Sequence, residues 1–276
     1  MTVNVPAKQD AARYPRGADG VCSKRGLQVA ILAGGLGTRL RPLTETIPKP
    51  LVAVCGKPFL QHQLELVREN GMSRVLLLVS YLGEKIEQRF GDGASLGLEV
   101  TYSYEPAPLG TGGALKHAAG KLEEEFLVLN GDTFLPIDYA TMASDFRRHK
   151  SAALIVAYDN CVPQTASNLA VAADGLVTAY RKRDPRGLTH IDAGAIILRR
   201  EVLDAIPPGR VCSLEEEVFP HLIEQERMRA WVTREPFFDM GTSAGLEALA
   251  RRLGRSSRGN AIPHTHRGQR SGQIPC

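Results

Sequence analysis

Short apolar runs alternate with helical segments through the first half of the chain, and this alternation restricts the fold more than any other feature. LQVAILA (27–33), RVLLLVSY (74–81) and EFLVLNGD (125–132) have the length and composition of buried strands. FLQHQLELVREN (59–70) places leucines at helical spacing and is followed by Gly71. Strands separated by helices form βαβ units, so we expect an α/β fold with a mostly parallel central sheet.

The pattern changes after about residue 160. Asp174-Gly175 separates two strand-like runs within 169–181, which predicts a β-hairpin. The later segments predict strands at 191–198 and 228–233, a helix at 214–225 that bends or ends near Pro220, and a closing helix at 243–253. A chain of 276 residues, 43% of them hydrophobic, is long enough for one large domain or two closely joined lobes.

The formal net charge of +4 comes from the two ends of the chain. Residues 1–26 carry +3, and residues 251–276 carry six arginines and no acidic residue, which leaves −5 for the middle. The basic balance therefore does not indicate a nucleic-acid-binding domain. Both ends also lack apolar periodicity. We predict a flexible N-terminal extension (1–26), a folded domain (27–253) and a disordered basic tail (254–276).

Cysteine usage and hydropathy bear on the compartment. The five cysteines are scattered at 22, 55, 161, 212 and 276 without metal-ligand spacing, which is typical of reduced thiols. No apolar stretch reaches the roughly 18–20 residues of a membrane span. The N-terminus has no hydrophobic core of a secretory signal. We expect a cytoplasmic protein that binds neither membrane nor nucleic acid.

The first predicted strand runs into a glycine-rich, basic loop, AGGLGTRLRPL. Ligands of open parallel sheets bind at the carboxyl ends of the strands, where this loop lies. Glycines let several backbone N–H groups approach a phosphate, and Arg39, Arg41 and Lys49 add charge-assisted hydrogen bonds. The loop lacks the Walker A pattern, and Leu40 stands where a dinucleotide fingerprint needs its last small residue. The protein-kinase elements are missing too, and we expect a triphosphate site of another kind.

Four motifs then occur in order: LAGGLGTRLRPLT…PKPL, EPAPLGTGGAL, LNGDT and FFDMGT. Together they resemble the sugar-1-phosphate nucleotidyltransferases, or nucleotide-sugar pyrophosphorylases, over roughly residues 27–250. The resemblance implies a Rossmann-like three-layer α/β/α sandwich of the nucleotide-diphospho-sugar transferase type. It also implies a reaction in which a nucleoside triphosphate and a sugar 1-phosphate give a nucleotide-sugar and pyrophosphate, with Mg²⁺ as cofactor.

Four residues carry the catalytic roles that the resemblance implies. Asp132 ends a buried strand and Asp239 follows two aromatic residues, and both would be Mg²⁺ ligands. Arg39 and Lys49 would hold the β- and γ-phosphates and stabilise departing pyrophosphate. Without the resemblance, Asp132 would be a turn cap, Asp239 an acid at the start of a helix, and Arg39 a solvated loop charge.

The substrate-binding roles follow from the same resemblance. PLGTGGAL would contact the base and ribose, although a helix-start turn without a ligand is the alternative. Lys182 would bind the phosphate of the sugar, but Arg181 stands where the family has a glutamate for a sugar hydroxyl, and an arginine cannot accept a hydrogen bond. Asp192 replaces a family asparagine, and its alternative role is to start a strand. The predicted substrate-binding residues are Gly34, Gly35, Gly37, Thr38, Gly110, Gly112, Gly113, Lys182, Asp192 and Gly194.

Within the family, the motifs look most like those of enzymes that activate D-glycero-D-manno-heptose 1-phosphate with GTP. Mannose-1-phosphate guanylyltransferases come next, followed by enzymes that transfer uridylyl or thymidylyl groups. Two further hypotheses are a non-catalytic nucleotide-binding regulatory subunit and a cytidylyltransferase for a non-sugar phosphate. The expected partners are the nucleoside triphosphate and the sugar 1-phosphate, and the class is compatible with homo-oligomers.

Overall fold

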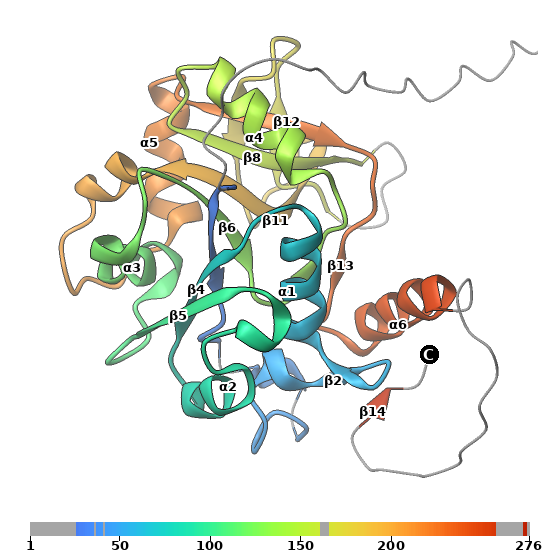
Figure 1. Cartoon of the computed structure of the whole chain (residues 1–276). Coiled ribbons are helices and arrows are strands. Elements are labelled where there is room, and N and C mark those ends of the chain that lie inside the picture. Colours follow the sequence, from blue (N-terminus) through green and yellow to red (C-terminus); the bar gives the residue numbers. More distant parts are fainter. Residues whose placement is uncertain (1–25, 36, 41, 161–165, 258–272, 275–276) are drawn as a thin grey trace, which may run out of the picture.

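The computed structural model of the chain describes residues 26–35, 37–40, 42–160, 166–257 and 273–274 (Figure 1). The extension predicted for 1–26 lies outside these residues except for Gly26, and so does most of the tail predicted for 254–276. Two elements reach into that predicted tail. Helix α6 (Ser243–Ser257) runs past the expected domain boundary at 253, and strand β14 (Gln273–Ile274) pairs in parallel with β2 (Ala53–Val54).

A nine-stranded sheet forms the centre of the molecule. Four of its strands lie side by side and parallel, in the order β6 (Glu125–Asn130), β1 (Gln28–Leu32), β4 (Arg74–Val79) and β5 (Glu99–Tyr104). Three of them are the apolar runs from which the sequence predicts buried strands. Their parallel pairing confirms the expected α/β fold class with a mostly parallel centre.

The second half of the chain makes the sheet mixed. Strand β11 (His190–Arg199) is antiparallel to both β6 and β8 (Ala153–Asp159), whereas β12 (Met228–Thr233) is parallel to β8. The predicted hairpin forms from β9 (Leu169–Val171) and β10 (Val177–Tyr180), and Gly175 in its turn has a φ of 88°. Glycine adopts this left-handed conformation without the steric cost that a side chain brings.

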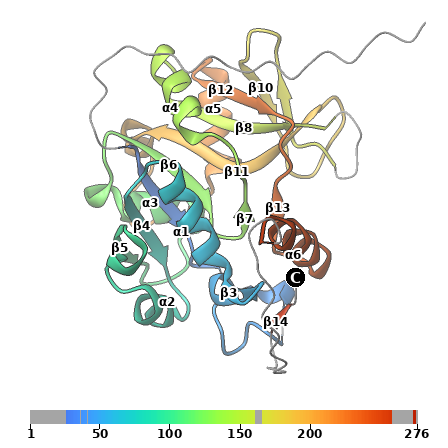
Figure 2. The same cartoon turned by 45° about the vertical axis from the view of Figure 1, so that its right-hand side comes forward.

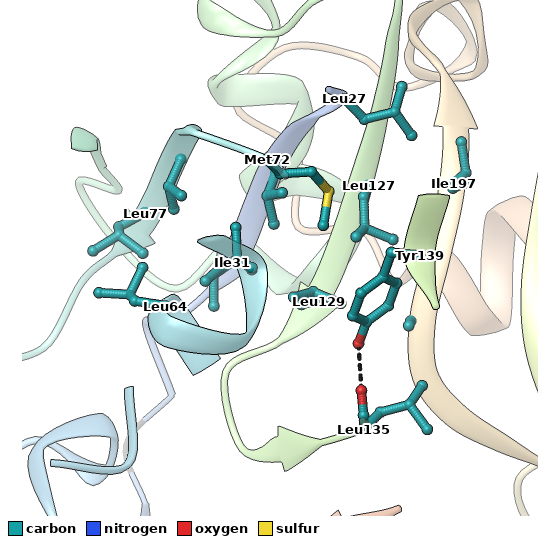
Figure 3. Packing of buried hydrophobic residues seen from close by; sticks show 14 of the residues in the cluster. Leu27, Ile31, Leu64, Met72, Leu77, Leu127, Leu129, Leu135, Tyr139 and Ile197 are labelled. Atoms are coloured by element: carbon teal, nitrogen blue, oxygen red, sulfur yellow. Dashed lines mark hydrogen bonds between the residues drawn. The ribbon is translucent and has the colours of Figure 1, made fainter. Parts of the chain in front are cut away.

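Helices cover both faces of the sheet, because successive side chains of each buried strand point to opposite sides. One face packs against α1 (Phe59–Glu69), α2 (Gly83–Phe90) and α4 (Tyr139–Arg148), and the other against α3 (Gly110–His117) and α5 (Phe219–Glu224). Figure 3 shows the first face, where Ile31 of β1 and Leu129 of β6 pack with Leu64 of α1. The hydroxyl of buried Tyr139 donates a hydrogen bond to the backbone oxygen of Leu135 at 2.8 Å.

The helix predicted at 214–225 forms in two parts. A π-helical turn spans Leu214–Val218, and α5 follows it with Pro220 in its first turn. A proline is tolerated there because the first N–H groups of a helix have no partner within the helix. The Ser213 hydroxyl caps the π-helical turn by accepting a hydrogen bond from the backbone N–H of Glu216.

A third apolar cluster joins α6 to a small antiparallel ribbon. The ribbon consists of β7 (Thr133–Phe134) and β13 (Phe238–Asp239), in which Asp239 lies opposite Thr133. Figure 1 and Figure 2 both show α6 beside β13 and away from the central sheet. This packing brings the motif near the end of the domain back to the carboxyl end of β6.

The structure corrects one expectation about the thiols. Cys212 is a free, buried cysteine, but Cys55 is disulfide-bonded, so the prediction of reduced thiols is wrong at that position. As for membranes, none of the helices in the described ranges has the length and apolar character of a transmembrane span.

We expect Gly131→Ala to destabilise the protein. The backbone N–H of Gly131 donates to the Leu32 oxygen at 3.0 Å, and a Cβ at Gly131 would lie 2.3 Å from that oxygen. The strands would have to separate locally, so the free energy of unfolding should fall by about 1–3 kcal/mol in a denaturant titration. Gly120→Ala is the matched control, because a Cβ there meets nothing within 4 Å. Equal stability of the two variants would contradict this account.

Candidate active site

A cavity of about 640 Å³ lies at the carboxyl ends of β1, β5 and β6. This is the edge where open α/β sheets bind ligands. Nine of the residues predicted from the sequence line the cavity: Gly34, Gly35, Gly37, Thr38, Arg39, Lys49, Gly110, Asp132 and Lys182. Segments that are far apart in the sequence therefore converge here. Arg41, which the sequence suggests as an additional phosphate ligand, lies outside the described residues.

Five predicted residues lie outside that lining: Asp239, which is described below, and the two pairs Gly112–Gly113 and Asp192–Gly194. Gly112 and Gly113 donate their backbone N–H groups to the Cys212 oxygen at 2.9 and 3.1 Å, so these amides hold α3 against the segment before the π-helical turn. Asp192 and Gly194 line a smaller cavity, which shares Asn130 and Glu215 with the first.

The glycine-rich loop has one glycine that the fold requires and one that it does not. Gly37 has a φ of 63°, and its oxygen accepts hydrogen bonds from the Thr44 hydroxyl at 2.8 Å and the Leu40 N–H at 3.0 Å. Gly35 is exposed to the cavity, its φ lies outside the left-handed region, and a Cβ there would meet nothing within 4 Å. The open space at Gly35 leaves room for a ligand to approach the backbone closely.

An ion pair joins two of the charged groups that line the cavity. The Lys49 Nζ donates to Asp132 Oδ2 at 2.6 Å, and the side chains are 10% and 32% exposed. Lys49 lies in a 3₁₀ turn, Lys49–Leu51, between Pro48 and Pro50, which restricts the backbone on both sides. A buried ammonium group needs a partner of opposite charge, and Asp132 supplies it.

Asp239 stands next to this pair because of the β7–β13 ribbon. The Met240 N–H donates to the backbone oxygen of Asp132 at 2.9 Å, and the Gly241 N–H donates to the carboxylate oxygen Oδ1 of Asp239 at 2.6 Å. The Arg39 guanidinium lies against the same turn, since a Cβ at Gly241 would be 3.0 Å from Arg39 Nη2 and 2.9 Å from Asp239 Oδ1. Asp132 and Lys49, which line the cavity, thus lie close to the turn that carries Asp239, and so does Arg39.

The donor set around this turn fits a Mg²⁺ ion. Magnesium takes one or two carboxylates from a protein and completes its octahedron with water and phosphate oxygens. Asp132 and Asp239 provide two carboxylates, and within the part of the chain that the structure describes, no three His, Cys, Asp or Glu side chains cluster into a complete metal site. A metal held jointly by these two acids and a phosphate ligand agrees with both observations.

Asp192 lies on β11 and is half-buried. Its Oδ2 accepts a hydrogen bond from the Tyr180 hydroxyl at 3.1 Å and its Oδ1 accepts one from the Gly194 N–H at 2.9 Å. Burial raises the pKa of Asp192 to about 6; nearby Glu215 acts in the same direction, whereas the hydrogen bonds and the charge of Lys182 oppose the shift. Gly194, with a φ of 76°, allows the bulge that places Asp192 here.

Several residues of the cavity lining were missed in the sequence. Glu105 follows β5 and Asn130 is the last residue of β6, so their positions at strand ends could have indicated them. The Leu109 N–H donates to Glu105 Oε2 at 2.9 Å, and burial raises the pKa of this carboxyl. Thr111 and Glu215 also line the cavity. Nothing local marks Glu215, because only the folded chain brings the π-helical turn to Lys182.

Comparisons with known proteins agree with the resemblance. The chain matches the profile of the Nucleotidyl transferase family over residues 28–253. It is 36% identical to the mannose-1-phosphate guanylyltransferase of Mycobacterium tuberculosis over 259 residues, which cover 90% of this chain and 69% of that protein. It is 35% identical to the mannose-1-phosphate guanylyltransferase catalytic subunit beta of Drosophila pseudoobscura pseudoobscura, with 78% of this chain and 59% of that protein covered. The chain therefore spans only part of these relatives.

A solved structure is similar over its whole length. HddC from Yersinia pseudotuberculosis, complexed with GMP-PN, has a TM-score of 0.70 and 30% sequence identity to this chain. The match covers 83% of this chain and 100% of HddC. The three-layer fold and its mixed sheet are thus those of a nucleotide-diphospho-sugar transferase.

The raised pKa of Asp192 predicts a pH-dependent effect of Asp192→Asn on stability. The folded protein binds a proton more tightly at Asp192 than the unfolded chain, so the wild type loses stability as the pH rises from about 4 to about 6, and the loss is complete above 6. The free energy of unfolding of the variant relative to the wild type should therefore increase over this range, by up to about 3 kcal/mol. Urea titrations at pH 4.5 and 7.5 measure the change, and a difference that stays constant would show that Asp192 titrates normally.

Proposed function

Because the chain belongs to the Nucleotidyl transferase family, we propose that it transfers a guanylyl group from GTP to a sugar 1-phosphate and releases pyrophosphate. The observation that carries the proposal is the cavity at the carboxyl ends of the strands. The glycine-rich loop with Arg39, the Lys49–Asp132 ion pair and Lys182 all line this cavity. Such a cavity suits two phosphorylated substrates that must meet.

The reaction is a direct displacement. An oxygen of the sugar 1-phosphate attacks the α-phosphorus of GTP and forms a new P–O bond. The bond from the α-phosphorus to the bridging oxygen breaks, and its electron pair leaves with pyrophosphate. Both reactants are anions, so the protein contributes mainly orientation and positive charge. Arg39 and Lys49 stabilise the triphosphate and the leaving group, and Lys182 holds the sugar phosphate.

Asp132 and Asp239 would hold Mg²⁺ in the loaded enzyme. The metal supplies charge neutralisation at the triphosphate and polarises a phosphoryl oxygen. Lys49 also neutralises Asp132. A bound nucleotide would give the Lys49 ammonium a second anionic partner, so the same side chain can pair with Asp132 and bind phosphate.

For the nucleotide and sugar, the relatives support guanylyl transfer to a manno-configured ring. The two curated relatives are named mannose-1-phosphate guanylyltransferases, and HddC is complexed with GMP-PN. We propose D-glycero-α-D-manno-heptose 1-phosphate as the acceptor, because the motifs resemble those of heptose-activating enzymes, so that the product is GDP-heptose. Mannose 1-phosphate is the second candidate, favoured by the sequence identity of 36% to the mycobacterial enzyme.

A non-catalytic regulatory subunit is the proposal from a different class. Such a subunit needs none of the catalytic charges, yet Arg39, Lys49 and Asp132 all line the cavity, and Asp239 lies opposite Thr133, the residue after Asp132. A cytidylyltransferase for a non-sugar phosphate would have no use for Lys182 and Asp192. An assay with different substrates distinguishes each of these two hypotheses from the proposed function.

Pyrophosphate release tests the proposal directly. GTP, UTP, dTTP, CTP and ATP are each combined, in the presence of Mg²⁺, with heptose, mannose, glucose and N-acetylglucosamine 1-phosphates. We expect turnover with GTP and a manno-configured sugar 1-phosphate. Turnover with another pair would reassign the substrates, and nucleotide binding without any turnover would favour the regulatory subunit.

Asp132→Asn should lower both activity and stability. Loss of a key electrostatic group costs roughly 10²–10³ in kcat. The variant also leaves the buried Lys49 ammonium without its partner, which should lower the free energy of unfolding by about 1–3 kcal/mol, because Asp132 is partly exposed. The double variant K49M/D132N should regain stability but not activity. Normal turnover of D132N with Mg²⁺ would refute the role of Asp132.

Gly35→Ala should weaken nucleotide binding without affecting the fold. A Cβ at Gly35 meets nothing in the protein, but it would stand between the loop backbone and a phosphate. Losing one or two hydrogen bonds to a charged group should raise the KM for GTP by roughly 10- to 100-fold. The melting temperature should match that of Gly120→Ala. An unchanged KM for GTP would show that the phosphates lie elsewhere.

A further inference from the structure

The position where the family resemblance predicts a sugar-binding carboxylate carries Arg181, and this side chain is committed elsewhere. Its Nη2 donates a hydrogen bond to the Arg186 oxygen at 2.6 Å, within the exposed turn that follows β10. Its neighbour Lys182, by contrast, lines the cavity. A sugar ring beside Lys182 presents hydroxyl groups, which need an acceptor from some other element of the fold.

Glu215 is the carboxylate that the fold brings to this place. It lines both the main cavity and the smaller one that contains Asp192, and its side chain is only 13% exposed. Its Oε2 lies 3.4 Å from the Lys182 Nζ. Glu215 therefore stands between the lysine proposed to bind the sugar phosphate and the aspartate on β11.

Hydrogen bonds fix this carboxylate. Its Oε2 accepts from the Thr111 hydroxyl at 2.9 Å and from the Ser213 hydroxyl at 2.6 Å. The same Thr111 hydroxyl accepts from the Leu214 N–H at 2.9 Å, so Thr111 joins α3 to the π-helical turn at both Leu214 and Glu215. A carboxylate held in this way loses little rotamer freedom when it binds a ligand.

Glu215 is also held in its charged form. Burial raises its pKa, but the hydrogen bond from Ser213, one from a backbone amide, the charge of Lys182 and the hydrogen bond from Thr111 outweigh burial, so the pKa lies below its usual value. An ionised carboxylate only accepts hydrogen bonds, and those to a charged group are the strong ones. These properties suit a group that recognises sugar hydroxyls.

We propose that Glu215 accepts hydrogen bonds from ring hydroxyls of the sugar 1-phosphate, in place of the carboxylate that the chain lacks at Arg181, with Thr111 and Ser213 as its positioning residues. The inference rests on the proposed function. It makes the π-helical turn a determinant of sugar specificity, because the carboxylate approaches the ring from a different element than the strand end that carries Lys182.

The test compares Glu215→Gln with Glu216→Gln, its exposed neighbour in the same turn. With the best substrate pair, kcat/KM for the sugar 1-phosphate should fall by roughly 10- to 100-fold in E215Q, the value of one charged hydrogen bond. The KM for GTP and the affinity for GTP measured by calorimetry should change by less than about threefold. E216Q should behave as the wild type, and thermal unfolding shows whether E215Q is folded.

Deoxy sugars separate recognition from a structural role. If Glu215 binds a hydroxyl, one monodeoxy sugar 1-phosphate should be used equally well by the wild type and E215Q, because the lost contact is the same. A penalty that is equal for every analogue, or a parallel loss of GTP affinity, would show instead that Glu215 only ties the π-helical turn to α3. An unchanged kcat/KM in E215Q would also overturn the inference.

Ser213 offers a second variant that leaves Glu215 in place. Ser213→Ala should raise the KM for the sugar 1-phosphate with little change in kcat, and Ser213→Thr, which keeps the hydroxyl, should restore it. Calorimetric titration with the sugar 1-phosphate and with the GDP-sugar covers the case of an inactive wild type. Binding without turnover would overturn the proposed function, but the affinities of E215Q and the wild type for these ligands could still be compared. No binding at all would overturn both the proposed function and the inference about Glu215.

Discussion

The parallel pairing of β1 with β6 is the constraint on which the site depends. It continues one residue past the end of β6, through the hydrogen bond from the Gly131 N–H to the oxygen of Leu32, the last residue of β1. A side chain at Gly131 would collide with that oxygen, so only glycine lets the two strand ends stay together. Because of this contact, the glycine-rich loop after β1 and Asp132 after β6 open into the same cavity.

Charge balance is the second feature that organises the site. Lys49 and Asp132 line the cavity and form an ion pair, and Arg39 and Asp239 both lie near Gly241. Lys49 and Asp132 thus compensate each other's charge, which limits the cost of burying them. The ribbon of β7 and β13 makes this arrangement possible, since it brings the segment that precedes α6 to the end of β6.

The fold and the core of the site were largely predictable from local patterns. Apolar strands, amphipathic helices and the Asp174-Gly175 hairpin leave periodic marks, and the strand-end rule places the loop at Gly34–Gly37 and Asp132 on one edge. The sequence did not indicate what the Gly112 and Gly113 amides contact within the protein. Motif position put them near the base, whereas their amides bond to the Cys212 oxygen, a partner about a hundred residues away that no local pattern reveals.

The sequence by itself determined the α/β class and the parallel centre, because both follow from apolar runs and helical segments that are local along the chain. Only the tertiary structure decided what stands next to Lys182. Arg181 turns away to Arg186, and Glu215 arrives from a π-helical turn that is tied to α3 through Thr111. That position depends on long-range packing and on hydrogen bonds between distant segments, and such contacts exist only once the chain has folded.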